Sequence, residues 1–348
     1  MRRFKGKCPY GSSNVETALI RDRRFNFGWL FFVWALSAAF LMSASALAQS
    51  YPTKAIKMIV PFPPGGISDV ISRIVGQKLS ESWGQPVVIE NRPGAGTRIA
   101  AEFIAKSPPD GYTLYFTDIT THSINASLYS KLPYDSLKSF APVIMVTSTP
   151  LILVMHPSVP AKSVKELIDL AKSKPGQLNI GISGIGTITH LAGEMFKSMA
   201  GIQMVNIPYT GSAPATTGIL SGEASLMFST MPAGLPHVKA GKLRGLAVTT
   251  PKRVATAPDI LTMIEAGVPG FEAVLYSGIL APANPPKEIV SRLNSELRRI
   301  LQLPDVRERF AQQGGEPSPG TPEELGARMK SLIEMWAKVV KASGAKVD

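Results

Sequence analysis

Three segments of the sequence join a short apolar run to a helical pattern through a glycine-rich turn. They are Pro63-Pro-Gly-Gly-Ile-Ser-Asp69, Ser183-Gly-Ile-Gly-Thr187 and Pro208-Tyr-Thr-Gly-Ser-Ala-Pro214. The first turn of a helix leaves backbone N–H groups without intrahelical partners and carries the positive end of the helix dipole. Glycine lets an anion approach the backbone, and Ser or Thr adds a hydroxyl donor. These turns are candidate carboxylate or phosphate sites, although each alone also fits an ordinary strand-to-helix turn.

Nucleotide and metal chemistry find no support in the motifs. The sequence has no GxxxxGK[ST] segment, and the spacing Gly181-x-x-Gly184-x-Gly186 differs from the dinucleotide-binding fingerprint. His122, His156 and His237 fall in separate regions without the spacing of metal ligands. We therefore predict neither a metal site nor a cofactor.

Catalytic patterns are equally weak. Ile185 stands where a GxSxG nucleophile elbow would need glycine. Ser183, His190 and Asp69 have the residue types of a hydrolytic triad, but nothing in their spacing brings them together. Asp69 also fits a helix cap, and His190 a packed or capping histidine, while Tyr209 can form an apolar wall with a polar tip. No catalytic residue is predicted, and a secreted hydrolase of small esters or amides is the alternative from another class.

Length and composition indicate a globular protein large enough for two domains. The chain has 348 residues, of which 45% are hydrophobic and 18% charged. Of its net charge of +12, seven basic and two acidic residues fall in residues 1–48, and the remaining excess is spread without a basic run. Nucleic acid is therefore not an expected partner.

The N-terminus has the pattern of a secretion signal over residues 1–48. A basic segment at Arg21–Arg24 precedes an uncharged, largely apolar stretch that ends in Ala46-Leu-Ala48, which predicts cleavage after Ala48 and export to the periplasm. An uncleaved membrane anchor is the alternative. The only cysteine, Cys8, lies in this leader, so the mature chain would have no disulfide or thiolate site.

Beyond residue 50, short apolar runs alternate with helical patterns, which is typical of parallel sheets covered by helices. We predict strands at residues 56–60, 87–90, 113–117, 179–183, 205–208, 225–228 and 243–249, and one or two within 142–155 that are interrupted at Ser148-Thr-Pro150. Predicted helices follow residue 66, open at a Ser163/Glu166 capping box, span about 187–199, follow Pro282, span 304–313, and open at Thr321-Pro-Glu-Glu324.

An ordered set of short motifs resembles the substrate-binding proteins of tripartite tricarboxylate transporters, also called Bug receptors. The matching segments are Tyr51-Pro, Pro61-Phe-Pro-Pro-Gly-Gly-x-x-Asp69, Glu90-Asn-Arg-Pro-Gly-Ala-Gly96, Asp110-Gly-Tyr-Thr113, Ser183-Gly-x-Gly-Thr187 with His190-Leu-Ala, Pro208-Tyr-x-Gly-x-x-Pro-Ala215, Glu265-Ala-Gly267 and Ala281-Pro282. Each motif is weak alone, but the combination is specific and covers essentially all of residues 50–348.

The resemblance implies an α/β fold of the two-lobed, type II-like periplasmic binding protein class, in which each lobe is a mostly parallel sheet flanked by helices. Lobe 1 would comprise residues 49–150 plus 275–348 and lobe 2 residues 151–274, joined by crossover strands. The expected function is that of a monomeric periplasmic receptor, which captures a di- or tricarboxylate, an aromatic acid or a similar small carboxylate for a membrane permease of the tripartite type. A sensory co-receptor that presents the ligand to a membrane sensor is a further alternative.

The resemblance also implies the ligand-binding residues. In the first lobe they are Pro64, Gly65, Gly66 and Asp69, with Asn91, Gly94 and Ala95 in the neighbouring turn. The second lobe would contribute Ser183, Gly186, Thr187, His190 and Tyr209, and Thr117 and Thr230 are looser candidates.

Four positions depart from the family's usual pattern. Thr97 replaces a glycine, Thr210 a frequent lysine, Ser225 a common aspartate and Leu261 a frequent proline. Because the neutral residues at 210 and 225 remove a cation and an anion, an amino-acid ligand is less expected and a neutral or aromatic acid more so.

Overall fold

The computed structural model describes residues 51–347 of the chain. The predicted leader and its cleavage site lie outside the described residues. Residues from Pro52 onward form one compact unit. Within residues 51–347, no helix combines the length and apolar character needed to cross a bilayer.

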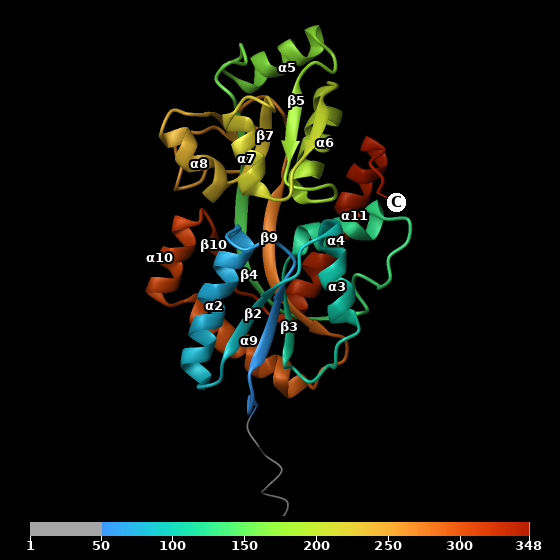
Figure 1. Cartoon of the computed structure of the whole chain (residues 1–348), viewed down its shortest axis with the longest axis vertical. Helices are drawn as coiled ribbons and strands as arrows, with labels where there is room; N and C mark the ends of the chain where they lie inside the picture. Colours follow the sequence, from blue (N-terminus) through green and yellow to red (C-terminus); the bar gives the residue numbers. More distant parts are fainter. Residues whose placement is uncertain (1–50, 348) are drawn as a thin grey trace, which may run out of the picture. The chain divides into compact units, whose positions relative to one another are not determined.

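Two groups of parallel strands form the two ends of one curled sheet (Figure 1). In the first lobe, β1 (Ile56–Val60) lies between β2 (Val87–Asn91) and β3 (Thr113–Asp118) and is parallel to both. In the second lobe, β5 (Asn179–Ile182) is parallel to β6 (Val205–Pro208) and β7 (Leu226–Thr230). The α/β class and the parallel strands predicted for each lobe are confirmed.

Two long antiparallel strands, β4 (Phe140–Met155) and β9 (Val274–Pro282), cross between the lobes. The first part of β4 pairs with β9 and with the short β10 (Glu316–Pro317), and its last five residues lie between β7 and β8 (Arg244–Val248). The predicted lobe boundaries fall within or beside these strands, and their exact positions remain a prediction.

The break predicted at Ser148-Thr-Pro150 is wrong, because β4 continues through it. Ser148, Thr149 and Pro150 pair in register with consecutive residues of β9. The pairing of β4 with β9 is irregular nearer the start of β4, where the register shifts twice. No strand was predicted at β9, since Ser277-Gly278 interrupts its apolar run. Gly278 is needed there because a Cβ atom would lie 2.9 Å from Ile119 Cγ1.

Helices cover the faces of both lobes. The first lobe has α2 (Ile67–Trp83), η1 (Ala95–Thr97), α3 (Arg98–Ala105), α4 (Ile119–Leu128), α9 (Lys287–Leu301), α10 (Pro304–Gln312) and α11 (Pro322–Ser343). The second has α5 (Val164–Ser173), α6 (Ile188–Ala200), α7 (Ser212–Leu220) and α8 (Met231–Lys239). Sequence patterns predicted neither α3, α4 nor α8. The apolar residues of α4 and α8 do not follow one clear stripe, whereas α3 has such a stripe but is only eight residues long.

The two predicted capping boxes have different outcomes. Thr321 and Glu324 form a complete box at the start of α11, with both reciprocal hydrogen bonds present. Ser163 accepts the amide of Glu166, but the Glu166 carboxylate turns to the amide of Lys162, one residue too early for a box. The helix starts where predicted and the Ser163 side-chain bond is present. The predicted bond from the Ser163 amide to the Glu166 carboxylate is wrong.

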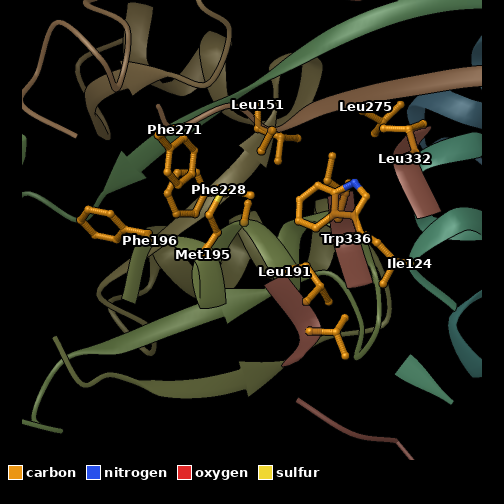
Figure 2. Packing of buried hydrophobic residues seen from close by; sticks show 14 of the residues in the cluster. Ile124, Leu151, Leu191, Met195, Phe196, Phe228, Phe271, Leu275, Leu332 and Trp336 are labelled. Carbon is orange, nitrogen blue, oxygen red and sulfur yellow. The ribbon is translucent and has the colours of Figure 1, made fainter. Parts of the chain in front are cut away.

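A continuous hydrophobic cluster extends through both lobes (Figure 2). In the second lobe, Phe228 stacks on Phe271 with ring centroids 5.5 Å apart. Trp336 on α11 is fully buried, and α11 packs against both α4 and α6. A helix of the first lobe thus reaches over the second, which limits how the lobes can move.

Candidate ligand-binding cleft

Five strand-to-helix junctions meet at a cleft of about 360 Å³ between the lobes. The first lobe contributes the β1–α2 and β3–α4 junctions, and the second the β5–α6, β6–α7 and β7–α8 junctions. The lining residues are Phe62–Ser68, Asp118, Ser183, Thr187–Thr189, Thr210–Pro214, Thr230 and Leu275. Parallel strands bring their carboxyl ends to the same edge of a sheet, where open α/β folds bind ligands. The volume fits a small molecule.

Four of the helices that start at this cleft have no side-chain cap. Their N-cap residues are Gly66 of α2, Thr187 of α6, Gly211 of α7 and Thr230 of α8. The N-cap residues of these helices therefore provide no side-chain acceptor for the amides of the first turn. Among the described residues that line the cleft there is no lysine, arginine or histidine. Positive potential must come from backbone amides and helix dipoles, which favours an anion held by neutral donors.

The β1–α2 turn is held in place from behind. Gly65 has φ +81°, a left-handed conformation that favours glycine, and its amide donates to Asp69 Oδ2 across 2.9 Å. Asn91 Nδ2 donates both to Asp69 Oδ1 and to the carbonyl of Phe62. Burial alone would raise the pKa of Asp69, but hydrogen bonds from Arg73, the Gly65 amide and Asn91 lower it. Pro64, Gly65 and Gly66 line the cleft, whereas Asp69 and Asn91 support them.

Three hydroxyl groups gather on the opposite wall. Ser183 Oγ lies 2.8 Å from Thr189 Oγ1, and Thr187 Oγ1 lies 2.9 Å from the same atom. Thr189 Oγ1 also accepts the amide of Ser183, and Thr187 Oγ1 donates to the carbonyl of Gly184. Because these hydroxyls share one network, a ligand oxygen at this wall would meet several rotatable donors at once.

The predicted turn residues Gly94 and Ala95 lie outside the cleft lining. Residues 94–97 all have positive φ, including Ala95 at +45° and Thr97 at +78°. Tyr129 Oη donates to the Ala95 carbonyl across 2.8 Å, which holds the turn against α4. Thr97 thus takes a left-handed conformation at a position where the family usually has glycine, and such strain costs about 1–3 kcal/mol.

Gly186 packs at the contact between the lobes instead of facing the cleft. A Cβ atom at this position would lie 2.7 Å from Leu128 Cδ2 of α4. The neighbouring Ile185 carbonyl lies against Gly96, where an added Cβ would be 3.1 Å away. Gly186 is therefore required for close approach of the lobes, and it does not line the cleft.

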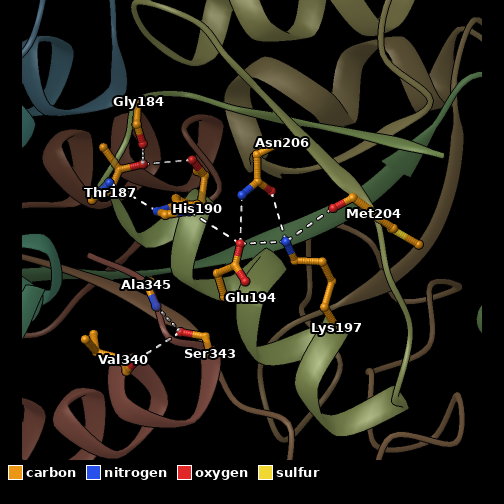
Figure 3. Close-up of polar contacts among 12 residues, drawn as sticks. Gly184, Thr187, His190, Glu194, Lys197, Met204, Asn206, Val340, Ser343 and Ala345 are labelled. Atoms are coloured by element: carbon orange, nitrogen blue, oxygen red, sulfur yellow. Dashed lines mark hydrogen bonds and ion pairs between the residues drawn. The ribbon is translucent and has the colours of Figure 1, made fainter. Parts of the chain in front are cut away.

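His190 does not line the cleft and belongs to a polar network along α6 (Figure 3). Its Nδ1 accepts the Gly186 amide, so the neutral ring carries its proton on Nε2, which lies 3.4 Å from Glu194 Oε1. Lys197 Nζ is 2.6 Å and Asn206 Nδ2 is 2.7 Å from the same oxygen. Burial acts to raise the pKa of Glu194, but hydrogen bonds from His190, Asn206 and Lys197 lower it to about 2.

Thr117 and Tyr209 also lie outside the lining. Thr117 is fully buried in β3, opposite Gly278 of β9. The Tyr209 ring lies over Gly218 of α7, where a Cβ atom would be only 2.4 Å from Tyr209 Cζ. Of the predicted site residues, the cleft therefore brings together Pro64, Gly65, Gly66, Ser183, Thr187 and Thr230.

Asp118 is a cleft residue that sequence reasoning missed. It ends β3 and caps α4, where its Oδ1 accepts the amides of Thr120 and Thr121 at 2.9 and 3.1 Å. Burial raises its pKa to about 6, against the opposing effect of hydrogen bonds from Thr121 and the backbone amides. The short Asp-x-Thr-Thr segment resembles a helix start, but without a predicted α4 it could not be placed. Thr210, a departure from the family pattern, also lines the cleft, whereas Ser225 does not.

Comparisons with known proteins converge on one family. Residues 71–344 match the tripartite tricarboxylate transporter family receptor. Protein BugT of Bordetella pertussis is 38% identical over 307 residues, which cover 88% of this chain and 94% of BugT. Two similar solved structures carry bound acids. R. palustris Rpa4515 with adipate has a TM-score of 0.81 at 37% identity and covers 85% of this chain and 99% of its own. MatC from Rhodopseudomonas palustris with bound malate has a TM-score of 0.79 at 29% identity, and the match covers 83% of this chain and 100% of MatC.

Proposed function

Because the chain belongs to the tripartite tricarboxylate transporter receptor family, we propose that it is a periplasmic receptor that captures a small carboxylate and delivers it to a membrane transporter. The observation that carries this function is the set of four helix starts without a cap from their own N-cap side chains, around one small cleft without basic side chains. Relatives of known structure bind adipate and malate, and both acids are small enough for such a cleft. The relatives are binding receptors, not enzymes, which disfavours the hydrolase alternative.

The binding residues follow from the two walls of the cleft. One ligand carboxylate would bind at the turn formed by Pro64, Gly65 and Gly66. Its donors would be the amides of Gly66 and of the first turn of α2, because proline has no N–H and the Gly65 amide already donates to Asp69. The far end of the ligand would meet the hydroxyls of Ser183 and Thr187 and the start of α8 at Thr230. Each hydrogen bond to a charged group contributes about 1.5–3 kcal/mol. A ligand that satisfies both walls at once binds the closed state better than the open one, so it shifts the population toward closure.

Three further features belong to the same proposal. The chain would be exported by a leader cut after Ala48, act as a monomer, and dock on a permease of the tripartite type. A sensory co-receptor would share the cleft but deliver its ligand to a membrane sensor. Affinity capture of membrane fractions with the ligand-loaded protein distinguishes these partners, since a transporter subunit and a sensor kinase differ in identity.

A panel of acids tests the receptor function directly. Purified protein is screened by thermal shift against acetate, succinate, malate, adipate, citrate, glutamate and benzoate, each matched with its methyl ester. We expect stoichiometric stabilisation by at least one free acid, confirmed by calorimetry, and no hydrolysis of the esters. Absence of binding by every acid, or turnover of an ester, would overturn the proposal.

A further inference from the structure

One hydrogen bond joins the two lobes directly behind the cleft wall. The amide of Ile188, the first residue of α6, donates to Thr121 Oγ1 across 3.2 Å. Thr121 belongs to α4, which packs in the first lobe against β9 and α11. In the second lobe α6 packs against β5 and β7, and it also contacts α11 of the first lobe. The bond therefore crosses from one lobe to the other where α4 and α6 meet.

Asp118 fixes the direction of this bond. Thr121 Oγ1 donates its proton to Asp118 Oδ2 across 2.5 Å, so that its lone pairs remain for the incoming amide. The other Asp118 oxygen accepts the amides of Thr120 and Thr121, which keeps the carboxylate in place. Asp118 and Thr121 are at most 1% exposed. Water therefore does not compete for these atoms while the lobes are together. The Thr121 hydroxyl keeps one orientation, in which it donates to Asp118 and accepts from the Ile188 amide.

The amide of Ile188 has a special position among the helix starts. It lies in the first turn of α6, where no side chain of its own lobe caps the helix. Ile188 and its neighbours Thr187 and Thr189 all line the cleft. A contact that fixes this amide therefore also fixes the wall that faces the ligand.

We propose that Thr121, held by Asp118, is a positioning residue for ligand retention: it fastens the start of α6 to the first lobe in the closed receptor and slows ligand release. The inference rests on the proposed receptor function. Thr121 itself does not line the cleft, so its effect on the ligand is indirect. Because the bond must break before a bound ligand can leave, whereas a ligand enters while the lobes are apart, its loss raises the dissociation rate and leaves the association rate nearly unchanged.

Hydroxyl deletion at position 121 tests the inference. Thr121→Val keeps the shape of the side chain, Thr121→Ser keeps the hydroxyl, and Thr121→Ala gives a second deletion should the valine variant fold poorly. Thr262→Val is the matched control, because Thr262 is also buried and also accepts a backbone amide, that of Glu265, but within one lobe. Dissociation is followed by stopped flow with the tightest-binding acid among succinate, malate and adipate.

We expect the valine and alanine variants to release the acid about 5- to 30-fold faster, with association changed by less than about twofold. The serine variant should be within about threefold of the wild type, and Thr262→Val should match the wild type. In the ligand-free protein, hydrogen exchange of the Ile188 amide should accelerate at least about tenfold in the deletion variants only. Unchanged release in both deletion variants, or equal acceleration by Thr262→Val, overturns the inference. If none of these acids binds, the receptor function is contradicted. The hydrogen-exchange measurement then still decides whether the inter-lobe bond exists.

Discussion

The amide of Gly65 donates a hydrogen bond to Asp69 Oδ2, four residues along the chain. Asp69 is 3% exposed, and its carboxylate also accepts hydrogen bonds from Asn91 Nδ2 and the Arg73 guanidinium. The carboxylate thereby holds a turn whose own conformation requires glycine at position 65. A residue that looks like a ligand contact in the sequence thus supports the backbone that lines the cleft.

Replacing Asp69 by Asn should destabilise the protein by about 1–3 kcal/mol, because Asn91 and Arg73 lose a charged acceptor. Hydrogen bonds hold the folded-state pKa of Asp69 below its usual value of 3.8. Stabilisation by the carboxylate is therefore complete above this value and is lost as the pH falls through the lower, folded-state pKa. Urea unfolding of both proteins from pH 7 to pH 3 measures the difference, which should be constant at neutral pH and shrink in acid. A difference that grows in acid would contradict this role.

Replacing Gly66 by Val should abolish acid binding and leave the fold intact. Gly66 has φ −75°, which any residue can adopt, and an added Cβ would meet only the Pro63 carbonyl at 3.6 Å. The branched side chain would instead occupy the approach to the turn amides. Calorimetry should show at least about a 100-fold loss, the effect of removing roughly two charge-assisted hydrogen bonds.

Gly66→Ala, which adds only the Cβ atom, tests whether the turn tolerates a side chain. Gly326→Ala is its control, since a Cβ atom there would also make one ordinary contact, with Pro142 at 3.5 Å. Both alanine variants should melt within a few degrees of the wild type. Retention of full affinity by Gly66→Val would place the carboxylate elsewhere.

Thr249 connects the two crossover strands and should be sensitive to loss of its hydroxyl. Its Oγ1 accepts the amide of Leu151 on β4 at 2.9 Å and lies 2.6 Å from the carbonyl of Ala273, next to β9. Thr249→Val should cost about 1–3 kcal/mol because buried backbone groups lose their partner. The neighbouring Thr250→Val removes a hydroxyl that contacts only the exposed Lys252 carbonyl and should cost less than about 0.5 kcal/mol. Equal midpoints of urea unfolding for the two variants would show that the connection is not important.

Local sequence signals were sufficient for the elements that carry their own pattern. The strand at residues 56–60, the Thr321/Glu324 capping box and the buried stripe that includes Ile71 and Leu79 were all predictable, because each depends on spacing within one segment. The family fold was predictable for another reason, since it rested on the order of several motifs along the chain.

Features that depend on distant contacts could not be predicted in this way. His190 was a plausible cleft residue from its spacing, but its ring contacts Glu194 and the Gly186 amide and does not line the cleft. Pro150 resembled a strand break, yet it pairs with Val274, which is more than a hundred residues away. Asp118 had no recognisable context without α4. Tertiary contacts decided each of these positions, and no single-segment pattern contained them.

The buried Asp118 carboxylate should make stability fall with rising pH. Burial raises its folded-state pKa from 3.8 to about 6, so between these values the folded protein keeps a proton that the unfolded chain releases. Below this window both states are protonated and no effect remains, whereas above it the loss levels off at about 3 kcal/mol, from 1.36 kcal/mol per pKa unit. Asp118→Asn cannot ionise and should lack this component. Urea unfolding of the two proteins between pH 3.5 and pH 7.5 isolates it as a difference, since all other carboxylates titrate in both. Parallel pH profiles would mean that Asp118 is stabilised as an anion, for which the amides of Thr120 and Thr121 and the Thr121 hydroxyl are the available donors.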